Sequence, residues 1–491
     1  MTPNVNLELL KTIQIIQGGM GVYISTPFLA KSVSMNGGLG TISGVAPDRI
    51  FALILQNGDP GGHYRRALSH FPFQDKARKV LDAFFIEGGK NNPKFLNRRG
   101  VPFYSVNPSS LLISLIVCAN FSFVWLAKEG HNKPVSMNYL EKIAMPHIYA
   151  IFGAMLSGID VITMGAGIPR YIPDVITEVL EGRIIKYPVP VSGENIGEDD
   201  RNIREYWMSF EPEKFFGAKI PPMKRPAFIP IISSYVLAKK VFCRIEEEHP
   251  GSISGFVVEE STAGGHNAPA REGLVDTTTG EPIYTDKDKV DYKKLCELGF
   301  PFWIGGSYPT PEKLKFALLV GASGIQVGTI FALCEESGMD PKLRNEVRRL
   351  GYRGQLRVKT SPKASPTGYP FKVACLPGTL SEDDVYQNRE RICNQGALVE
   401  LYWKSDKSIG YRCSAEPIEH YLAKGGKIEE TANRCCICNG LIATAGLSTN
   451  GKPPIVTTGD YLGFLNDPKI MRHENDTYHV WNVFNYLDQI I

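Results

Sequence analysis

The sequence lacks any strong imbalance of charge. Its 54 Lys and Arg residues nearly cancel its 51 Asp and Glu residues, which leaves a formal net charge of +3 over 491 residues. No block of like charge stands out along the chain. Binding to nucleic acid or to an anionic membrane surface usually depends on a concentrated basic patch. The composition therefore argues against nucleic acid and membranes as partners.

A disulfide framework is also absent. The ten cysteines are scattered through the chain, which is typical of a protein from a reducing compartment. The densest group, Cys435, Cys436 and Cys438, could belong to a zinc or iron–sulfur site only if Cys393 or Cys413 completed the ligand set. Buried free thiols are the favoured interpretation, so we expect no metal.

Long hydrophobic runs are rare. Residues 1–6 lack the basic stretch, the apolar run and the cleavage site of a secretory signal, so we expect a cytoplasmic protein. The longest apolar stretch, 111–127, is shorter than the roughly 20 residues of a membrane helix and contains three polar residues. A buried strand followed by a helix is predicted there, with a membrane span as the alternative.

The sequence has no GxGxxG motif between a strand and a helix, so a separate NAD(P)-binding domain is not expected. What it does contain is a repeated order of apolar run, glycine-rich turn and helix-like segment. The predicted strands are 13–16, 39–43, 134–138, 159–163, 229–232, 255–258, 302–304 and 324–327. Eight apolar strands with helix-length spacers indicate an α/β fold, the parallel (β/α)8 or TIM barrel. A doubly wound open sheet is the alternative.

Glycines follow the last two predicted strands. Gly305 and Gly306 come after the seventh strand, and Gly328 and Thr329 come after the eighth. Barrels commonly bind phosphate between these two loops, because backbone N–H groups reach the anion where no Cβ intervenes. Simple turns would explain each glycine alone, but their occurrence together favours a phosphate site.

Two segments exceed the needs of a simple barrel. The spacer between the second and third strands, about 44–133, is too long for a βα crossover and predicts a helical insertion. The barrel itself is assigned to residues 1–340. Residues 341–491 contain proline- and glycine-rich stretches and predict a C-terminal extension that wraps and caps the barrel.

Several stretches together resemble the nitronate monooxygenase family, once called 2-nitropropane dioxygenases. They are IIQGGMGVYISTPFLAKSVSMNGGLGTIS at 15–43, VSMN at 135–138, DVITMGAGIP at 160–169, STAGGH at 261–266 and PFWIGGSYPTPEKLKFALLVGASGIQVGTIF at 301–331. The resemblance covers most of residues 13–340 in the right order. It implies a TIM barrel with non-covalent FMN and no metal. The same superfamily includes flavin-dependent enoyl-acyl-carrier-protein reductases, so the resemblance implies the cofactor more firmly than the substrate.

The resemblance also assigns residues to the cofactor. By position, the cofactor-binding residues are Gly18, Gly19, Met20, Asn138, Glu260, Gly264, Gly265, Gly305, Gly306, Gln326, Val327, Gly328 and Thr329. Within this set, 18–20 would lie against the flavin, Asn138 would hydrogen-bond it, and 305–306 and 326–329 match the two phosphate loops. The family often has glutamine where this chain has Glu260. An acid there would disfavour an anionic reduced flavin nearby.

His266 is the candidate catalytic residue. It follows paired glycines after an apolar strand, and the resemblance implies that it faces the flavin ring and takes the proton next to a nitro group. An unperturbed pKa near 6.5 suits a base at neutral pH. The alternative is a structural histidine that pairs with Glu259 or Glu260.

The leading functional hypothesis is FMN-dependent oxidation of alkyl nitronates by O2 to carbonyl compounds and nitrite. Its small-molecule partners would be an alkyl nitronate or nitroalkane, together with O2. A second hypothesis is NAD(P)H-dependent reduction of an enoyl thioester through FMN. A third is an FMN-binding protein with little turnover. A homo-oligomer is compatible with each of these hypotheses.

Overall fold

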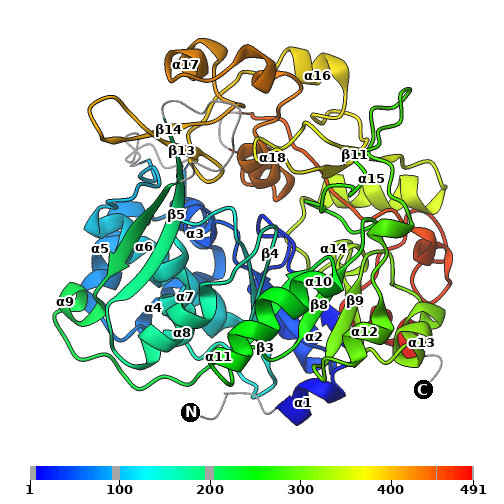
Figure 1. Cartoon of the computed structure of the whole chain (residues 1–491), viewed down its shortest axis with the longest axis horizontal. Helices are drawn as coiled ribbons and strands as arrows, with labels where there is room; N and C mark the ends of the chain where they lie inside the picture. The colour runs from blue at the N-terminus through cyan, green and yellow to red at the C-terminus, as the bar shows by residue number, and fades with distance from the viewer. Residues whose placement is uncertain (1–6, 91–99, 194–203, 449–450, 489–491) are drawn as a thin grey trace.

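The computed structural model describes residues 7–90, 100–193, 204–448 and 451–488, and a parallel eight-stranded sheet forms its centre (Figure 1). The strands are β1 (Ile15–Gln17), β2 (Gly40–Ser43), β3 (Val135–Leu140), β4 (Val161–Gly165), β7 (Ala227–Ile232), β8 (Phe256–Glu259), β9 (Phe302–Gly305) and β10 (Gly324–Val327). Their order is β1-β10-β9-β8-β7-β4-β3-β2. The Gln17 N–H donates to the Leu39 carbonyl at 3.0 Å and brings β1 next to β2. The predicted TIM barrel is thus confirmed.

A small apolar cluster fills the inside of the barrel. Its members are Leu10, Ile13, Ile16, Leu39, Val161, Ala227, Ile229, Val257 and Trp303. Side chains alternate between the two faces of a strand, so each strand sends some residues inward and others toward the surrounding helices. Trp303 is fully buried and donates its indole N–H to the Ile13 carbonyl at 2.6 Å. Leu10 comes from α1 (Leu7–Thr12), which covers the lower end of the barrel in Figure 1.

Helices follow the strands and form the outer layer. They are α2 (Pro27–Met35), α7 (His147–Leu156), α8 (Ile172–Leu180), α10 (Tyr235–Leu237), α11 (Cys243–Glu248), α12 (Tyr292–Cys296), α13 (Pro311–Leu319) and α14 (Thr329–Ala332). Helices α2 and α13 begin alike, at Thr26-Pro27 and Thr310-Pro311. In each, the threonine hydroxyl accepts a backbone N–H of the first turn and proline supplies a preset φ.

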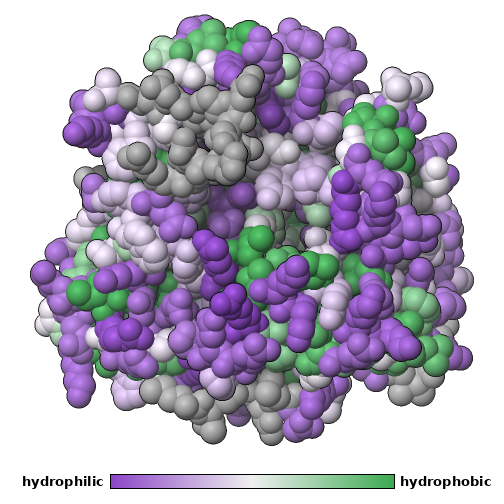
Figure 2. Space-filling model, in the orientation of Figure 1, coloured by the Kyte–Doolittle hydropathy of each residue, from purple (hydrophilic) through white to green (hydrophobic). Residues whose placement is uncertain are grey.

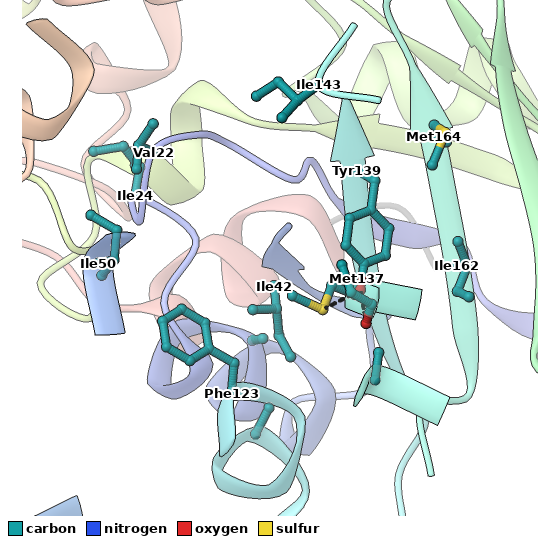
Figure 3. Close-up of a cluster of buried hydrophobic side chains, with 14 of the residues drawn as sticks. Val22, Ile24, Ile42, Ile50, Phe123, Met137, Tyr139, Ile143, Ile162 and Met164 are labelled. Carbon is teal, nitrogen blue, oxygen red and sulfur yellow. Dashed lines mark hydrogen bonds between the residues drawn. The ribbon is translucent and has the colours of Figure 1, made fainter. Parts of the chain in front are cut away.

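The segment between β2 and β3 contains four α-helices among its described residues. They are α3 (Pro47–Gln56), α4 (His63–Ser69), α5 (Gln74–Phe84) and α6 (Ser110–Lys128). Figure 3 shows how this insertion packs on the barrel: Phe123 of α6 lies near Ile42 of β2, whereas Ile50 of α3 lies near Val22 and Ile24 of the loop after β1. The helical insertion expected after the second strand is therefore present.

Helix α6 corrects one prediction. Residues 111–127 form a single helix rather than a strand followed by a helix. By length and composition it could cross a membrane, but 78% of its most apolar window is buried within the protein. It packs against α2, α3, α4, α5 and α7. Because nearly every side of α6 is buried, its sequence has no amphipathic period to reveal a helix.

A second sheet was not predicted. Strands β5 (Ile185–Ser192) and β6 (Arg204–Phe210) follow β4 and precede β7 in the sequence, and they form an antiparallel pair outside the barrel sheet. Strand β13 (Glu400–Trp403) pairs in parallel with β5, and β14 (Ile409–Arg412) pairs with β13. Pro188 and Pro190 lie within β5. Proline is depleted from strands, which hid β5 from sequence reasoning.

The C-terminal extension runs across the upper part of Figure 1 and returns along its right side. It contains α15 (Pro341–Tyr352), β11 (Val358–Ser361), β12 (Phe371–Ala374), α16 (Asp383–Gln387), α17 (Ile418–Ala423), α18 (Ile437–Thr444) and α19 (Val480–Leu487), besides β13 and β14. The extension also contains the short helices η6 (Ile428–Thr431) and η7 (Gly463–Asn466), and earlier parts of the chain contain η1 (Pro60–Gly62), α9 (Pro212–Phe216), η4 (Ala238–Phe242) and η5 (Asp286–Asp288). The face in Figure 2 is largely hydrophilic, with apolar residues in separate small groups. Ile330 of the barrel and Val347 and Phe484 of the extension belong to the same buried core. Since the two parts share this core, the boundary at residue 340 stays a prediction.

We expect Trp303→Phe to lower the free energy of unfolding by about 1–3 kcal/mol, because it orphans the Ile13 carbonyl and leaves a void inside the barrel. Urea unfolding followed by circular dichroism measures the change. Trp481→Phe is the matched control, since Trp481 is 52% exposed and its replacement should change stability by about 0.5 kcal/mol or less. Equal effects of the two substitutions would contradict this account of the barrel interior.

Candidate active site

A cavity of about 230 Å³ lies at the C-terminal ends of the barrel strands. Residues at the ends of β1, β3, β4, β7, β8, β9 and β10 line it, together with parts of the C-terminal extension. In a parallel barrel all strands end at one rim, so segments that are distant in sequence meet there. This rim is where sequence reasoning expected the site.

The structure brings all but one of the predicted cofactor-binding residues to this cavity. Those that line it are Gly18, Gly19, Met20, Asn138, Gly264, Gly265, Gly305, Gly306, Gln326, Val327, Gly328 and Thr329. His266 lines it as well. They come from five separate stretches of the chain, and the fold brings these stretches together around one cavity. The exception is Glu260.

The loop after β1 is held by Ser25. Its hydroxyl accepts the Met20 N–H at 2.9 Å and donates to the Gly18 carbonyl at 3.1 Å. A Cβ on Gly19 would lie 2.1 Å from Cβ of Asn138, so only glycine allows this loop to rest on β3. The loop therefore presents backbone rather than side chain at these glycines.

Asn138 has a fixed orientation. Its side-chain amide donates to the Gly19 carbonyl at 3.1 Å, and its side-chain oxygen accepts the Thr163 hydroxyl at 2.9 Å. An asparagine amide has two N–H donors. One N–H beyond the bond to Gly19 can therefore serve a ligand in the cavity.

Four buried polar atoms of residues that line the cavity have no hydrogen-bond partner: Nε and Nη2 of Arg49, and one atom on each of two uncharged side chains. The uncharged groups are Nε2 of Gln326, at the end of β10, and Oγ1 of Thr458, in the extension. Both are hydrogen-bond donors, and buried donors normally have a partner because an unmade hydrogen bond is costly. A ligand that carries acceptor oxygens would satisfy both of them.

Glu259 is the last residue of β8 and Glu260 follows it, and the two side chains have different surroundings. Glu259 lines the cavity, and burial raises its pKa to about 8. Glu260 instead accepts hydrogen bonds from the hydroxyls of Tyr292 and, at 3.1 Å, Tyr308. Glu260 is not among the residues that line the cavity, and its contact with a cofactor stays a prediction. Glu259 is mostly protonated at neutral pH, so it adds little negative charge to the cavity.

His266 has a different partner and a different pKa from those expected. Its Nε2 lies 2.8 Å from the Ser365 hydroxyl of the extension. Its ring packs edge-on against the Phe371 ring, with 4.9 Å between the two ring centroids. Burial, with a smaller contribution from Lys142, lowers the pKa of His266 from 6.5 to about 4. The imidazole is therefore neutral at pH 7 and is a weaker base than the unperturbed value suggested. Ser365 takes the place of Glu259 or Glu260 as its hydrogen-bond partner.

The extension supplies wall residues that sequence reasoning missed. They are Phe371, Gln395, Ala397, Leu398, Ile437, Cys438, Leu441, Ile442, Thr444, Thr457, Thr458, Gly459 and Tyr461. Among the wall residues between 395 and 444, all but Gln395 and Thr444 are apolar. No motif in the sequence marks these positions, because their proximity to the barrel rim arises only from tertiary packing.

Arg49 also lines the cavity, but its charge is already compensated. Its side chain is buried, lies 3.6 Å from the Asp48 carboxylate and covers the Tyr104 ring at 4.0 Å. The Tyr104 hydroxyl donates to Asp48 at 2.5 Å. The ion pair balances the charge of Arg49, but its Nε and Nη2 make no hydrogen bond within the protein.

The cysteine group of the extension lies partly at the cavity. All ten cysteines are free thiols, and Cys438 lines the wall. Burial raises the pKa of Cys438 well above its ordinary value. Within the described part of the chain, no three His, Cys, Asp or Glu side chains are placed to hold a metal ion. Cys438 therefore contributes an uncharged thiol to the cavity wall.

Comparison with known proteins adds little to this site. No protein-family model and no curated relative matches this sequence. Among solved structures, FabK from Thermotoga maritima is 14% identical, with a TM-score of 0.47 over 98% of this chain and 93% of that chain. A nitroalkane oxidase from Streptomyces ansochromogenes is 12% identical, with a TM-score of 0.44 over 98% and 96%.

A third solved structure is the enoyl reductase domain of MlnA from the macrolactin biosynthesis cluster from Bacillus amyloliquefaciens. It is 12% identical, with a TM-score of 0.47 over 97% of this chain and 93% of that chain. At such low identities and TM-scores, these likenesses say nothing about what this chain binds or converts.

The lowered pKa of His266 predicts how stability depends on pH. Between pH 6.5 and 4 the unfolded chain binds a proton at this residue that the folded chain excludes, so stability falls as the pH decreases. We expect the free energy of unfolding to fall more steeply over this range in the parent than in His266→Gln. Urea unfolding at several pH values measures both slopes. His147, whose pKa burial also lowers to about 4, is present in both proteins and cancels. Parallel slopes would contradict the burial of a neutral His266.

Proposed function

We propose that this protein is an FMN-dependent oxidoreductase. One observation carries the proposal: the glycine loops after β1, β8, β9 and β10 converge with Asn138 on one cavity at the barrel rim. These are the positions that the family resemblance assigns to FMN. The unpartnered donors of Gln326 and Thr458 fit a ligand rich in acceptor oxygens, as FMN is. When bound, FMN would supply the electron or hydride transfer that amino-acid side chains cannot perform.

The residues divide the site into two ends. Gly305, Gly306 and Gly328 would hold the phosphate, because their backbones reach the cavity without an intervening side chain, and Thr329 would add its hydroxyl as a donor. The loop 18–20 and the remaining N–H of Asn138 would face the ring. This division follows the order of the strands around the barrel, in which β9, β10 and β1 are neighbours and β3 lies farther round.

The apolar wall favours an enoyl thioester as the substrate. Leu398, Ile437, Leu441 and Ile442 of the extension line the cavity beside barrel residues such as Ile143. An aliphatic wall stabilises an acyl chain by removing it from water. We therefore favour reduction of a carbon–carbon double bond next to a thioester, with NAD(P)H as the hydride source.

His266 fits this reaction as a neutral hydrogen-bonding group. If the Ser365 hydroxyl donates to Nε2, the proton of the neutral imidazole resides on Nδ1. That N–H could donate to the carbonyl oxygen of the thioester and polarise the double bond. The Ser365 hydroxyl is itself 2.8 Å from the Thr367 hydroxyl, so a short hydrogen-bonded chain orients the ring.

Oxidation of alkyl nitronates is the second candidate. The observation that favours it is the unprotonated imidazole of His266 at the cavity, which could accept a proton from a nitroalkane. A base whose pKa is about 4 removes such a proton slowly, so preformed nitronates would be the better substrates. An FMN-binding protein with little turnover remains the third hypothesis.

Anaerobic absorbance spectroscopy separates these functions. We expect the purified protein to show a flavin spectrum, to lose it on mixing with NADPH or NADH, and to regain it when an enoyl-coenzyme A is added. His266→Gln should bind the flavin and accept hydride but should return it to the enoyl thioester at least about tenfold more slowly. Loss of the spectrum with an alkyl nitronate, and not with NADPH or NADH, would overturn the reductase in favour of nitronate oxidation. Absence of bound flavin would overturn both.

The apolar wall can be tested by chain length. Leu441→Trp would fill part of the cavity, so we expect KM for a long-chain enoyl thioester to rise roughly tenfold while that for a four-carbon substrate changes little. Leu422→Trp on α17 is the control, because Leu422 is exposed and is not among the residues that line the cavity. Equal effects of Leu441→Trp on short and long substrates would contradict an acyl chain at this wall.

A further inference from the structure

A short segment of the extension crosses the barrel rim. We call residues 457–460 the rim strap. The Gly265 N–H donates to the Thr457 hydroxyl at 2.7 Å, and the Asp460 N–H donates to the Thr262 carbonyl at 3.1 Å. The Gly459 N–H donates to the Thr329 hydroxyl at 2.8 Å. The rim strap is thereby joined to the loops that follow both β8 and β10.

Gly264 makes room for the rim strap. A Cβ at this position would lie 2.9 Å from the carbonyl carbon of Thr458 and 3.0 Å from the Gly459 nitrogen. Backbone atoms cannot give way as the end of a flexible side chain can, so any larger residue would push the strap outward. The absence of a side chain at Gly264 therefore serves the extension as well as the cavity.

An ion pair anchors the same segment from the other side. Nζ of Lys372 lies 2.7 Å from both carboxylate oxygens of Asp460, and the Lys372 side chain is buried. The Lys372 N–H also donates to the Gly265 carbonyl at 2.9 Å, and the Ala374 N–H donates to the Val456 carbonyl at 2.9 Å. Strand β12 thus holds the rim strap and the β8 loop together. Lys372 also compensates the negative charge that Asp460 would otherwise bring to the rim.

Thr458 is the strap residue whose hydroxyl lacks a partner. It is 2% exposed, it lines the cavity, and its Oγ1 makes no hydrogen bond within the protein. A second unpartnered hydroxyl, Thr262 Oγ1, lies 3.0 Å from where a Cβ of Gly306 would stand. Two buried donors without acceptors therefore lie around the loops that end β9 and β10. An oxygen-rich anion is the ligand that would satisfy such donors.

We propose that the Thr458 hydroxyl binds the phosphate group of the cofactor, so that the C-terminal extension forms part of the cofactor site. The inference rests on the proposed binding of FMN. The phosphate is assigned, rather than the ring, because the rim strap is bonded to Thr329 and Thr262 beside the glycines of the two phosphate loops. The barrel alone would lack this donor. Retention of the cofactor would then depend on docking of the extension.

The test compares FMN with riboflavin, which has the same ring but no phosphate. Apoprotein is titrated with each flavin, and Kd is read from the quenching of flavin fluorescence. We expect Thr458→Val to raise Kd for FMN roughly 10- to 100-fold, the effect of losing one hydrogen bond to a charged group, and to leave Kd for riboflavin unchanged. Thr458→Ser, which keeps the hydroxyl, should bind FMN nearly as the parent does.

Thr431→Val is the matched control. It makes the same substitution in the extension, at a buried hydroxyl that donates to the Ile428 carbonyl at 2.7 Å and does not line the cavity. Its Kd for FMN should equal that of the parent. Lys372→Met, which releases Asp460, should weaken FMN binding as Thr458→Val does while the circular dichroism spectrum stays that of the folded protein.

Three outcomes would count against the inference or its premise. Unchanged FMN binding by folded Thr458→Val would overturn the role of Thr458. Equal losses for FMN and riboflavin would overturn its assignment to the phosphate. If the parent protein bound neither flavin, or bound FMN no more tightly than riboflavin, the proposed function would fail rather than the role of Thr458.

Discussion

Close approach of one backbone to another at glycine positions is the constraint on which the site depends. A Cβ on Gly18 would lie 3.2 Å from Cα of Gly328, and one on Gly264 would lie 2.9 Å from the backbone of Thr458. The first contact joins the loops after β1 and β10, and the second joins the β8 loop to the extension. Side chains at these points would separate the loops and open the chamber that they enclose. The glycines therefore shape the cavity as well as allow its turns.

Burial keeps two ionisable side chains at this cavity, those of Glu259 and His266, mostly uncharged. It raises the pKa of Glu259 and lowers that of His266, so both are mostly uncharged at neutral pH. Arg49 is paired with Asp48, and Lys372 with Asp460. A chamber of this kind costs an uncharged substrate little desolvation of protein charges. Such a setting is compatible with a neutral acyl chain at one end and a phosphate bound by neutral donors at the other.

The extension is attached to the barrel by buried charge as well as by apolar packing. Glu335, which follows α14, lies 2.6 Å from Arg344 and 2.8 Å from Arg348 of α15, and both arginine side chains are buried. Removing Glu335 would leave two buried cations without compensation, which is costly. This attachment makes the extension continuous with the barrel core. It explains how residues near 458 can complete a site that begins at residue 18.

The sequence by itself determined the barrel and most of the rim. Each of the eight strands is a short apolar run next to a glycine or a helix signal. Such a pattern can be recognised in the sequence without knowing which other strands the segment pairs with. The glycines at 18–19, 264–265, 305–306 and 328 were likewise identifiable, because their spacing after the strands is local information. Strands β5 and β13 were not, since their pairing joins segments about 200 residues apart.

Tertiary structure alone decided which groups face the cavity and in what charge state. Glu259 and Glu260 are adjacent, and successive strand residues point to opposite sides, so only the placement of β8 selects between them. The pKa of His266 depends on how much water the surrounding residues exclude, which no single residue type encodes. The rim strap reached the cavity only because β12, Lys372 and Gly264 position it there. Local sequence patterns determine where helices and strands form. Burial and long-range contacts determine which side chains reach the cavity and whether they are charged.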